Sequence, residues 1–462
     1  MKGKQFLTDQ SILRRIFLLL FPFLILLIFA FLQILNLMVF QAEKFKTQAD
    51  SNRILKEKVF PPRGLIFDTN DEIIVDNFIR QDLVVTPNFI EDYSLYLSLL
   101  SELVEIEKNT LEQVFYKKLS EIKPFQSFTL LRDLNDRQLA KVKLNFKDLP
   151  GTEINSSFSR NVVYGESSGA VTGYLGFASK QDILINPNLK NFNDQQVGLL
   201  GIEKEFDDEL RGTVGYRYSE KDARGGVLDV LSVEPSTKGK NIKLSIDIEL
   251  QDKLYKEFRG RKGALIAIEP DTGFIRAMIS SPSYNPNFFN NFKTEEIKLL
   301  FQNKNSPLFN RAISGQYPPA STLKPFIGLV ALEEDVITWQ EKILDEGEFF
   351  VEGDKRPYTG WKEGGHGEVN MEKAIAESSD VYFYNIAYDL TVNSIAPFLK
   401  KFGFGKSSDL FINESQGILP DKKWKLGQKG EFWFKGDTIN MGIGQGYILS
   451  LIHISEPTRL RS

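Results

Sequence analysis

The sequence predicts an α+β protein with a single N-terminal transmembrane helix. Three observations lead to this prediction: an uncharged apolar run over residues 16–40, β-rich runs paired around turn residues, and helical patterns alternating with Gly- and Pro-rich loops from about residue 304. The chain has 462 residues, 42% of them hydrophobic, which is enough for two or three domains with hydrophobic cores.

The apolar run is longer than the roughly 20 residues needed to cross a hydrocarbon core. No convincing signal-peptide cleavage site follows it, so we expect residues 1–15 to be a tail and residues 16–40 a membrane-spanning helix. Lysines and arginines lie on both sides of the run, so their distribution does not decide the orientation.

Residues 41–235 are predicted to form a mixed α/β domain. The stretch "GLIFDTNDEIIVDN" predicts two strands around a turn, and "GYRYSEKDARGGVLDVLSV" predicts a hairpin. The stretch "YSLYLSLLSELVEIEKNTLEQVFYKKLSEI" has helical periodicity, with Thr110 and Gln113 placed as a capping box for the second helix. Residues 234–241, "EPSTKGKN", have the composition of a linker.

Residues 236–450 are predicted to form a second domain. "KGALIAIEPDTGFIRAMIS" predicts a hairpin around its Pro-Asp-Thr-Gly turn. "STLKPFIGLVALEE" predicts a buried helix, and Pro325 fits that helix only in its first turn, where a missing N–H is tolerated. The helix should therefore start near Ala320–Ser321, with Ser321 at its positive end and Lys324 on the same face.

Composition restricts the chemistry of this protein. The net charge of −4 and the lack of a long basic run exclude nucleic acid as an expected partner. The absence of cysteine excludes a thiol nucleophile, a thiolate metal site and disulfides. Since only His366 and His453 are present, a nucleophile is expected to use another base.

Ser321 and Lys324 together suggest such a nucleophile and base. A serine hydroxyl needs an adjacent base, and lysine serves only when neutral, which requires lowering its pKa by roughly 2 to 3 units from about 10.4. Burial and a helix N-terminus lower it. The pattern Ser-x-x-Lys is short and common, so the alternative remains that Ser321 caps the helix and Lys324 is solvated.

The residues around this pattern resemble the class B penicillin-binding proteins. "NRAISGQYPPASTLKP" and the later "ESSDVYFYNIAYDL" resemble the S-x-x-K and S-x-N (or S-x-D) motifs of their transpeptidase domain. "RGLIFD", "GYLGF", "GLLGIEKEFDDELRGTVG" and "GIGQGY" match further family motifs in order, so the resemblance covers residues 14 to about 449. The aspartate of the second motif and the preceding "GWKEGGHG" favour penicillin-binding protein 2 of the rod-elongation machinery.

The resemblance implies a peptidoglycan D,D-transpeptidase that needs no cofactor or metal. Ser321 would attack the terminal D-Ala–D-Ala carbonyl, and Lys324 would take the hydroxyl proton. Ser378 would bridge protons toward the leaving amine, and Asp380 would position the substrate or the lysine. An amine of a neighbouring stem peptide would then resolve the ester, and β-lactams would acylate Ser321 as substrate mimics.

The resemblance also implies location and partners. The chain would lie in the bacterial inner membrane as a single-pass protein, with its tail in the cytoplasm and its catalytic domain in the periplasm. Residues 41–235 would form a non-catalytic pedestal. Peptidoglycan stem peptides, β-lactams, a multi-spanning glycosyltransferase and other elongation proteins would be its partners.

Several conspicuous polar residues are expected to be structural. His366 is more simply a structural residue of its glycine loop than a ligand for substrate or metal. Asp68 is expected in a turn or in packing, Arg211 and Glu203 as partners within the pedestal, and Tyr382–Tyr384 in helix packing.

Two alternative functions remain open. A β-lactam sensor or hydrolase of the same fold would turn penicillin over rapidly, although the pedestal argues against it. A non-catalytic cell-wall scaffold would form no adduct at Ser321.

The C-terminal residues depart from the family pattern. No Lys-Thr-Gly or Lys-Ser-Gly follows Asp380, and "LIHISEPTRLRS" replaces the Thr-Pro helix that the family has there. We therefore expect residues 451–462 to be a foreign tail on a truncated or chimaeric chain with an incomplete transpeptidase domain. Loss of an oxyanion donor costs about 10² to 10³ in rate, so this 462-residue chain is expected to fold poorly in its last domain and to react poorly with penicillin.

Overall fold

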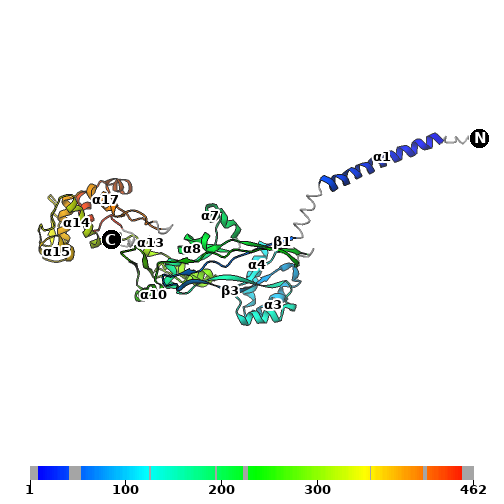
Figure 1. The fold of residues 1–462 in the computed structure, drawn as a ribbon, viewed down its shortest axis with the longest axis horizontal. Coiled ribbons are helices and arrows are strands. Elements are labelled where there is room, and N and C mark those ends of the chain that lie inside the picture. Colours follow the sequence, from blue (N-terminus) through cyan, green and yellow to red (C-terminus); the bar gives the residue numbers. More distant parts are fainter. Residues whose placement is uncertain are drawn as a thin grey trace, which may run out of the picture.

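A computed structural model shows an elongated protein, with a helical lobe at one end of a long β-rich body (Figure 1). The structure describes residues 9–40, 54–123, 126–192, 195–221, 227–353, 355–408 and 414–449. The predicted foreign tail, 451–462, lies outside these residues, as do residues 1–8 of the predicted cytoplasmic tail.

The N-terminal helix fits a membrane anchor. Helix α1 (Asp9–Leu35) continues into the short π-helix η1 (Asn36–Phe40). Within it, Leu20–Met38 is long and apolar enough to span a bilayer, and none of this segment is buried in the protein. A helix that exposes large apolar side chains along its length fits a lipid environment, so the structure is compatible with the predicted single N-terminal anchor helix.

Most strands of the pedestal form two sheets in which most neighbouring strands are antiparallel. A three-stranded sheet has the order β1-β8-β9, formed by Ile54–Val59, Gly215–Lys221 and Val227–Glu234. In the five-stranded sheet, the long β3 pairs with β5 from Val75↔Val162 to Val85↔Thr152, and with β2 and β4. These strands are β2 (Ile66–Phe67), β3 (Ile73–Val85), β4 (Phe128–Leu131), β5 (Thr152–Val162) and β10 (Ile242–Lys243). The β2–β3 and β8–β9 hairpins confirm two sequence predictions.

Three helices cover one end of β3 and enclose a core of their own. They are α3 (Tyr93–Val104), α4 (Lys108–Glu121) and α5 (Asp136–Leu144). The predicted capping box was wrong, because α4 already begins at Lys108 with Glu107 as its N-cap. The chain reverses at Glu105, which has a φ of 58°, so the next helix starts at once and Thr110 falls inside its first turn.

A buried ion-pair cluster ties the pedestal strands to its short helices. Glu203, in α8 (Gly201–Glu205), is 1% exposed and accepts from Nε of Arg63 and Nε of Arg160, each at 2.6 Å. Arg211, in α9 (Asp207–Arg211), bonds Asp207 at 2.5 Å. The prediction that Arg211 and Glu203 have intradomain partners is confirmed.

Asp68 closes the first hairpin turn, as predicted. Its Oδ1 accepts from the backbone N–H groups of Asn70 and Glu72, and its Oδ2 accepts from that of Ile248. It therefore also joins the pedestal to the following helix.

The remaining pedestal elements are short. Between β5 and β8 lie α6 (Glu166–Thr172), β6 (Leu175–Phe177), α7 (Lys180–Ile185), η4 (Pro187–Phe192) and β7 (Gln196–Gly198), and before β5 lie the 3₁₀ turns η2 (Pro87–Phe89) and η3 (Phe146–Asp148).

The segment with linker composition is held against the pedestal. The N–H of Gly239 donates to the carbonyl of Pro62, and the N–H of Lys240 to that of Glu209. Strand β10 then pairs in parallel with β2. The next elements are α10 (Ile248–Glu257) and the hairpin of β11 (Gly263–Ile268) and β12 (Ile275–Ser281), which confirms the predicted Pro-Asp-Thr-Gly hairpin. Their apolar side chains share one core with β2, β3 and β5.

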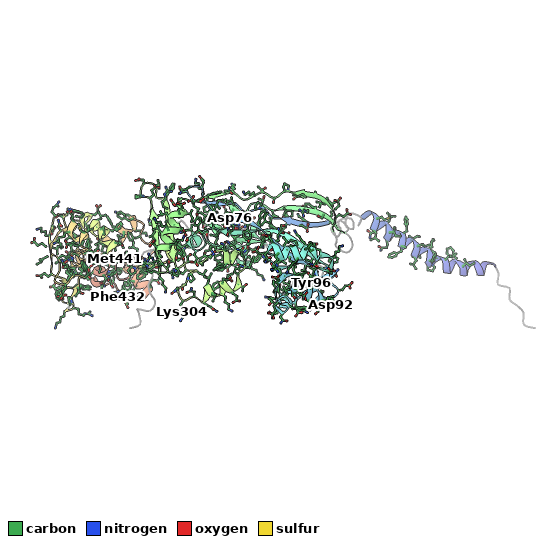
Figure 2. All side chains as sticks on the ribbon, turned by 90° about the horizontal axis from the view of Figure 1, so that it is seen from below. Asp76, Asp92, Tyr96, Lys304, Phe432 and Met441 are labelled. Atoms are coloured by element: carbon green, nitrogen blue, oxygen red, sulfur yellow. The ribbon has the colours of Figure 1, made fainter. Side chains whose placement is uncertain are left out.

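The helical lobe has a separate core and carries the candidate site. Three short helices, α11 (Asn287–Asn290), α12 (Thr294–Gln302) and α13 (Arg311–Ser314), lead to it. Its members are η5 (Ala320–Leu323), α14 (Lys324–Glu333), β13 (Ile343–Asp345), β14 (Glu348–Phe349), β15 (Tyr358–Thr359), β16 (Gly367–Val369), α15 (Met371–Ala376), α16 (Asp380–Asp389), α17 (Val392–Lys401), α18 (Lys422–Lys429) and α19 (Lys435–Gly442). Figure 2 shows Met441 in this lobe, far from Tyr96 at the other end of the body. Tyr382 and Phe383 are fully buried in this core and Tyr384 nearly so, which confirms their predicted packing role.

Candidate active site

Ser321 and Lys324 lie where a 3₁₀ turn becomes an α-helix. Ser321 is exposed in η5, and Lys324 is the first residue of α14 and only 1% exposed. Pro325 stands in the first turn of α14, as predicted. The helix is not buried on every side, since Leu329 is exposed. The hydroxyl therefore faces solvent at the positive end of the helix, while the amine lies inside the protein.

The Lys324 amine bonds the second predicted motif. Nζ donates to Asp380 Oδ1 at 2.6 Å, to the Ser378 carbonyl at 2.8 Å and to Ser378 Oγ at 3.0 Å. Ser378 Oγ in turn lies 2.8 Å from Ser321 Oγ. The structure thus brings all four predicted residues together, and the solvated alternative for Lys324 is wrong.

The contact between Lys324 and Ser321 runs through Ser378. Among the described residues, the hydrogen bonds of Nζ go to Ser378 and Asp380, and none goes to Ser321. Because hydroxyl groups both donate and accept, this arrangement allows a proton to pass from Ser321 to the amine through the Ser378 hydroxyl. The sequence analysis expected Lys324 to take the hydroxyl proton and Ser378 to bridge protons toward the leaving amine.

The buried position of Lys324 changes the pKa of its amine in the direction that a proton acceptor needs. Burial lowers the pKa of Lys324 below its usual value, and the opposing effects of the Asp380 and Asp345 carboxylates do not fully cancel it. A lowered pKa increases the fraction of neutral amine near neutral pH, and only the neutral amine accepts a proton.

Ser378 has an unusual backbone conformation. It follows the last residues of α15 with a φ of 57°, in the left-handed region that glycine usually occupies at a helix end. The N–H of Ser379 donates to the Ala374 carbonyl, which closes that helix end. Ser379 then caps α16, because its Oγ accepts from the N–H of Tyr382. A serine between two helices thus presents its hydroxyl to the nucleophile.

Trp361 contacts the same two residues from outside. Its backbone N–H donates to Asp380 Oδ2 at 3.1 Å, and its indole N–H donates to the Ser378 carbonyl at 3.1 Å. Its ring is largely exposed and packs edge-on against His366. In the sequence, Trp361 is marked only as part of the motif "GWKEGGHG".

The "GIGQGY" motif supports the nucleophile's backbone. The N–H of Ala320 donates to the Gly444 carbonyl at 2.9 Å. A Cβ at Gly444 would lie 2.1 Å from the Ala320 carbonyl oxygen, so only glycine fits there.

His366 is a structural residue in this arrangement, as predicted. It is buried, and its Nδ1 lies 2.7 Å from Asp345 Oδ2. In the described part of the chain, no group of three or more acidic or histidine side chains has an arrangement that could hold a metal ion. Asp345 was not found from the sequence, because nothing near it in the chain marks it.

Comparison with known proteins identifies two family domains in this chain. Residues 58–244 match the penicillin-binding protein dimerisation domain, and residues 263–456 match the penicillin-binding protein transpeptidase domain. The second match extends into the residues predicted as a foreign tail.

Relatives match over most of the chain. Peptidoglycan D,D-transpeptidase MrdA of Haemophilus influenzae is 33% identical over 90% of this chain and 65% of its own length. The protein of the same name from Salmonella typhimurium LT2 is 34% identical over 89% of this chain and 67% of its own. The chain thus spans about two thirds of the length of these relatives.

Solved structures of penicillin-binding protein 2 have the same fold. In the complex of the Helicobacter pylori protein with MreC, the matched chain is 29% identical, with a TM-score of 0.77, covering 86% of this chain and 75% of that one. The Pseudomonas aeruginosa protein is 28% identical, with a TM-score of 0.60, over 86% and 68%. The chain therefore belongs to the penicillin-binding protein family that joins a dimerisation domain to a transpeptidase domain, as penicillin-binding protein 2 does.

Proposed function

We propose that this protein is a serine D,D-transpeptidase of peptidoglycan that acts in cell elongation. The observation that carries the proposal is the continuous path from Ser321 Oγ through Ser378 Oγ to the buried Lys324 amine, with contacts of 2.8 and 3.0 Å. A serine needs such a base to attack an amide carbonyl. The names of the relatives support this class of reaction.

Acylation proceeds by one bond exchange at a D-Ala–D-Ala terminus. Ser321 Oγ bonds to the carbonyl carbon while its proton passes to Ser378, whose own proton passes to neutral Lys324. Return of a proton from Lys324 through Ser378 to the leaving nitrogen breaks the bond between that nitrogen and the carbonyl carbon, releases D-alanine and leaves an ester on Ser321. The amine nitrogen of a second stem peptide then bonds to the ester carbon while the bond to Ser321 Oγ breaks, and the amine's proton returns to Ser321 Oγ, which forms the crosslink and restores the hydroxyl.

Asp380 positions the lysine in this scheme. It accepts from the amine at 2.6 Å, so it holds the amine beside Ser378 and stabilises it when protonated. A β-lactam carbonyl reacts at Ser321 by the same first step.

The anchor sets the location. We propose that residues 1–15 lie in the cytoplasm, that residues 16–40 cross the inner membrane, and that residues 41–235 and 236–450 form the pedestal and the transpeptidase domain in the periplasm. The exposed apolar helix α1 supports a single-pass anchor. A multi-spanning glycosyltransferase and an MreC-like protein are the proposed partners, the second because the Helicobacter pylori relative forms a complex with MreC.

Prolonged incubation with benzylpenicillin followed by intact-protein mass spectrometry tests the proposal. We expect a stable adduct at Ser321 in the purified chain and none in Ser321→Ala, whose fold should be unchanged since the side chain is exposed. An adduct in Ser321→Ala would contradict the proposal. Rapid release of penicilloate would instead support a hydrolase, and no adduct after prolonged incubation would support a scaffold.

A further inference from the structure

Three buried polar side chains lie beside the proposed catalytic residues and have no part in the scheme above. Asp345, His366 and Ser379 are between 0 and 8% exposed. Asp345 Oδ2 accepts from Ser379 Oγ at 2.6 Å and from His366 Nδ1 at 2.7 Å. Burying a carboxylate is costly unless it is well hydrogen-bonded, so this arrangement needs a structural or functional reason.

Ser379 connects this cluster to the site. Its neighbours in the chain, Ser378 and Asp380, provide all three acceptors of the Lys324 amine. Its hydroxyl donates to Asp345 and accepts from the N–H of Tyr382, so both hydroxyl functions are used and the side chain is fixed. A shift of Ser379 would move both neighbours relative to the amine.

His366 supports the other side of the same residues. Its ring packs against Trp361, with centroids 5.5 Å apart, and Trp361 donates to both Ser378 and Asp380. Because Asp345 accepts at Nδ1, that nitrogen carries the proton. Asp345 thus forms hydrogen bonds both to Ser379, which lies between Ser378 and Asp380, and to His366, which packs against Trp361.

The Asp345 carboxylate is ionised in this arrangement. Burial raises its pKa, but the hydrogen bonds from Ser379, His366 and the N–H of Gly347 outweigh burial and hold the pKa below its usual value. Its charge also acts on Lys324, whose pKa it raises. The cluster therefore affects both the geometry and the electrostatics of the amine.

We propose that Asp345, His366 and Ser379 are positioning residues that hold Ser378 in its left-handed conformation and keep the Lys324 amine aligned with it. The left-handed backbone of Ser378 is strained for a non-glycine residue and persists only where its surroundings enforce it. The cluster provides that enforcement, and among the described residues none of the side-chain hydrogen bonds of Asp345, His366 and Ser379 goes to Ser321. The expected effect on acylation rests on the proposed function, whereas the expected effect on the conformation of Ser378 and the position of the Lys324 amine does not.

The kinetic test separates alignment from binding. Ser379→Ala and Asp345→Asn should lower the acylation rate constant for benzylpenicillin by about 10-fold or more, with little change in its binding constant. Ser379→Thr keeps the hydroxyl and the capping ability, so it should retain most of the rate. Glu368→Gln is the matched control for Asp345→Asn, because Glu368 lies on β16, the partner strand of Asp345, and is exposed. It should react at the wild-type rate.

Amine reactivity provides a test that does not depend on acylation. Brief acetylation of the native full-length protein, followed by peptide mass spectrometry, measures how well each lysine is protected. Lys324 in Ser379→Ala and Asp345→Asn should react about tenfold faster than in the wild type, since local opening exposes its amine. Lys425 is the internal reference, because it is equally buried in the same lobe and is bonded to Asp437 at 2.7 Å. Its reactivity should not change.

The outcomes distinguish this inference from the proposed function. A wild-type chain that forms no adduct would remove the proposed function, and Lys324 reactivity would still decide the inference. If both variants protect Lys324 as the wild type does, the positioning role is wrong, even where acylation at Ser321 is normal. Equal loss of protection at Lys324 and Lys425 would show general destabilisation and would also overturn it.

Discussion

Ser378 combines a left-handed backbone with a reactive hydroxyl, and two substitutions separate these properties. Ser378→Ala removes the hydroxyl and keeps the strained backbone, whereas Ser378→Gly removes the hydroxyl and relieves the strain. Both lose the contacts to Lys324 and Ser321 at 3.0 and 2.8 Å. Any difference between them therefore reports the backbone alone.

The expected difference follows from the φ of 57°. A left-handed conformation costs a non-glycine residue about 1–2 kcal/mol. Glycine also has more conformational freedom in the unfolded chain, which reduces the stability gained from relieving the strain by roughly 0.5–1 kcal/mol. Ser378→Gly should therefore be more stable than Ser378→Ala by about 0.5–1 kcal/mol, which corresponds to roughly 1–4 °C in melting temperature for a domain of this size.

Thermal melting and penicillin acylation measured on the same two proteins test this reasoning. Ser378→Gly should melt higher, and both variants should acylate more slowly than the wild type by about 10² or more, since each lacks the hydroxyl that passes the proton. Equal melting temperatures, or a more stable alanine variant, would show that the backbone of Ser378 is not strained. Normal acylation in either variant would remove its hydroxyl from the proton path.

Three further predictions concern other parts of the molecule. The acylation rate should rise with pH and level off below the usual lysine pKa of 10.5, because loss of the proton from Lys324 creates the base. Asp380→Asn should shift this pH profile to lower pH, since the Asp380 carboxylate raises the pKa of the Lys324 amine. A flat profile in both proteins would contradict the role of the amine. Glu203→Gln should destabilise the pedestal by about 3–5 kcal/mol in urea unfolding, because the buried Arg160 loses its carboxylate partner and the buried Arg63 keeps only Asp207. An unchanged midpoint would show that the cluster is dispensable. Gly444→Ala should lower both stability and the acylation rate, since the new Cβ would lie 2.1 Å from the carbonyl oxygen of Ala320. Gly446→Ala is the control and should affect acylation little, because Gly446 has a similar positive φ but a Cβ there would lie 3.4 Å from its nearest neighbour, Asn440 Cβ. Equal acylation of the two glycine variants would argue against the clash.

Features that depend on neighbouring residues in the chain could be predicted from the sequence. An uncharged run of sufficient length predicts the anchor, because crossing a bilayer is a matter of length and polarity. Pro325 placed the start of the catalytic helix to within one turn, since a proline is tolerated only there. The hairpins were predicted from turn residues between β-rich runs. Ser321, Lys324, Ser378 and Asp380 were found through short motifs within a family resemblance.

The interactions among these residues could not be predicted from the sequence, because they depend on how distant segments pack. Ser378 lies 54 residues after Lys324 and 57 residues after Ser321 in the chain. The three residues meet because α14 packs against α16. Asp345 has no local signal, because its role comes from partners 21 and 34 residues away. The pKa of Lys324 depends on its burial, which no sequence interval specifies. Local patterns fix backbone conformation, whereas hydrogen bonds and burial at this site arise only when distant segments fold together.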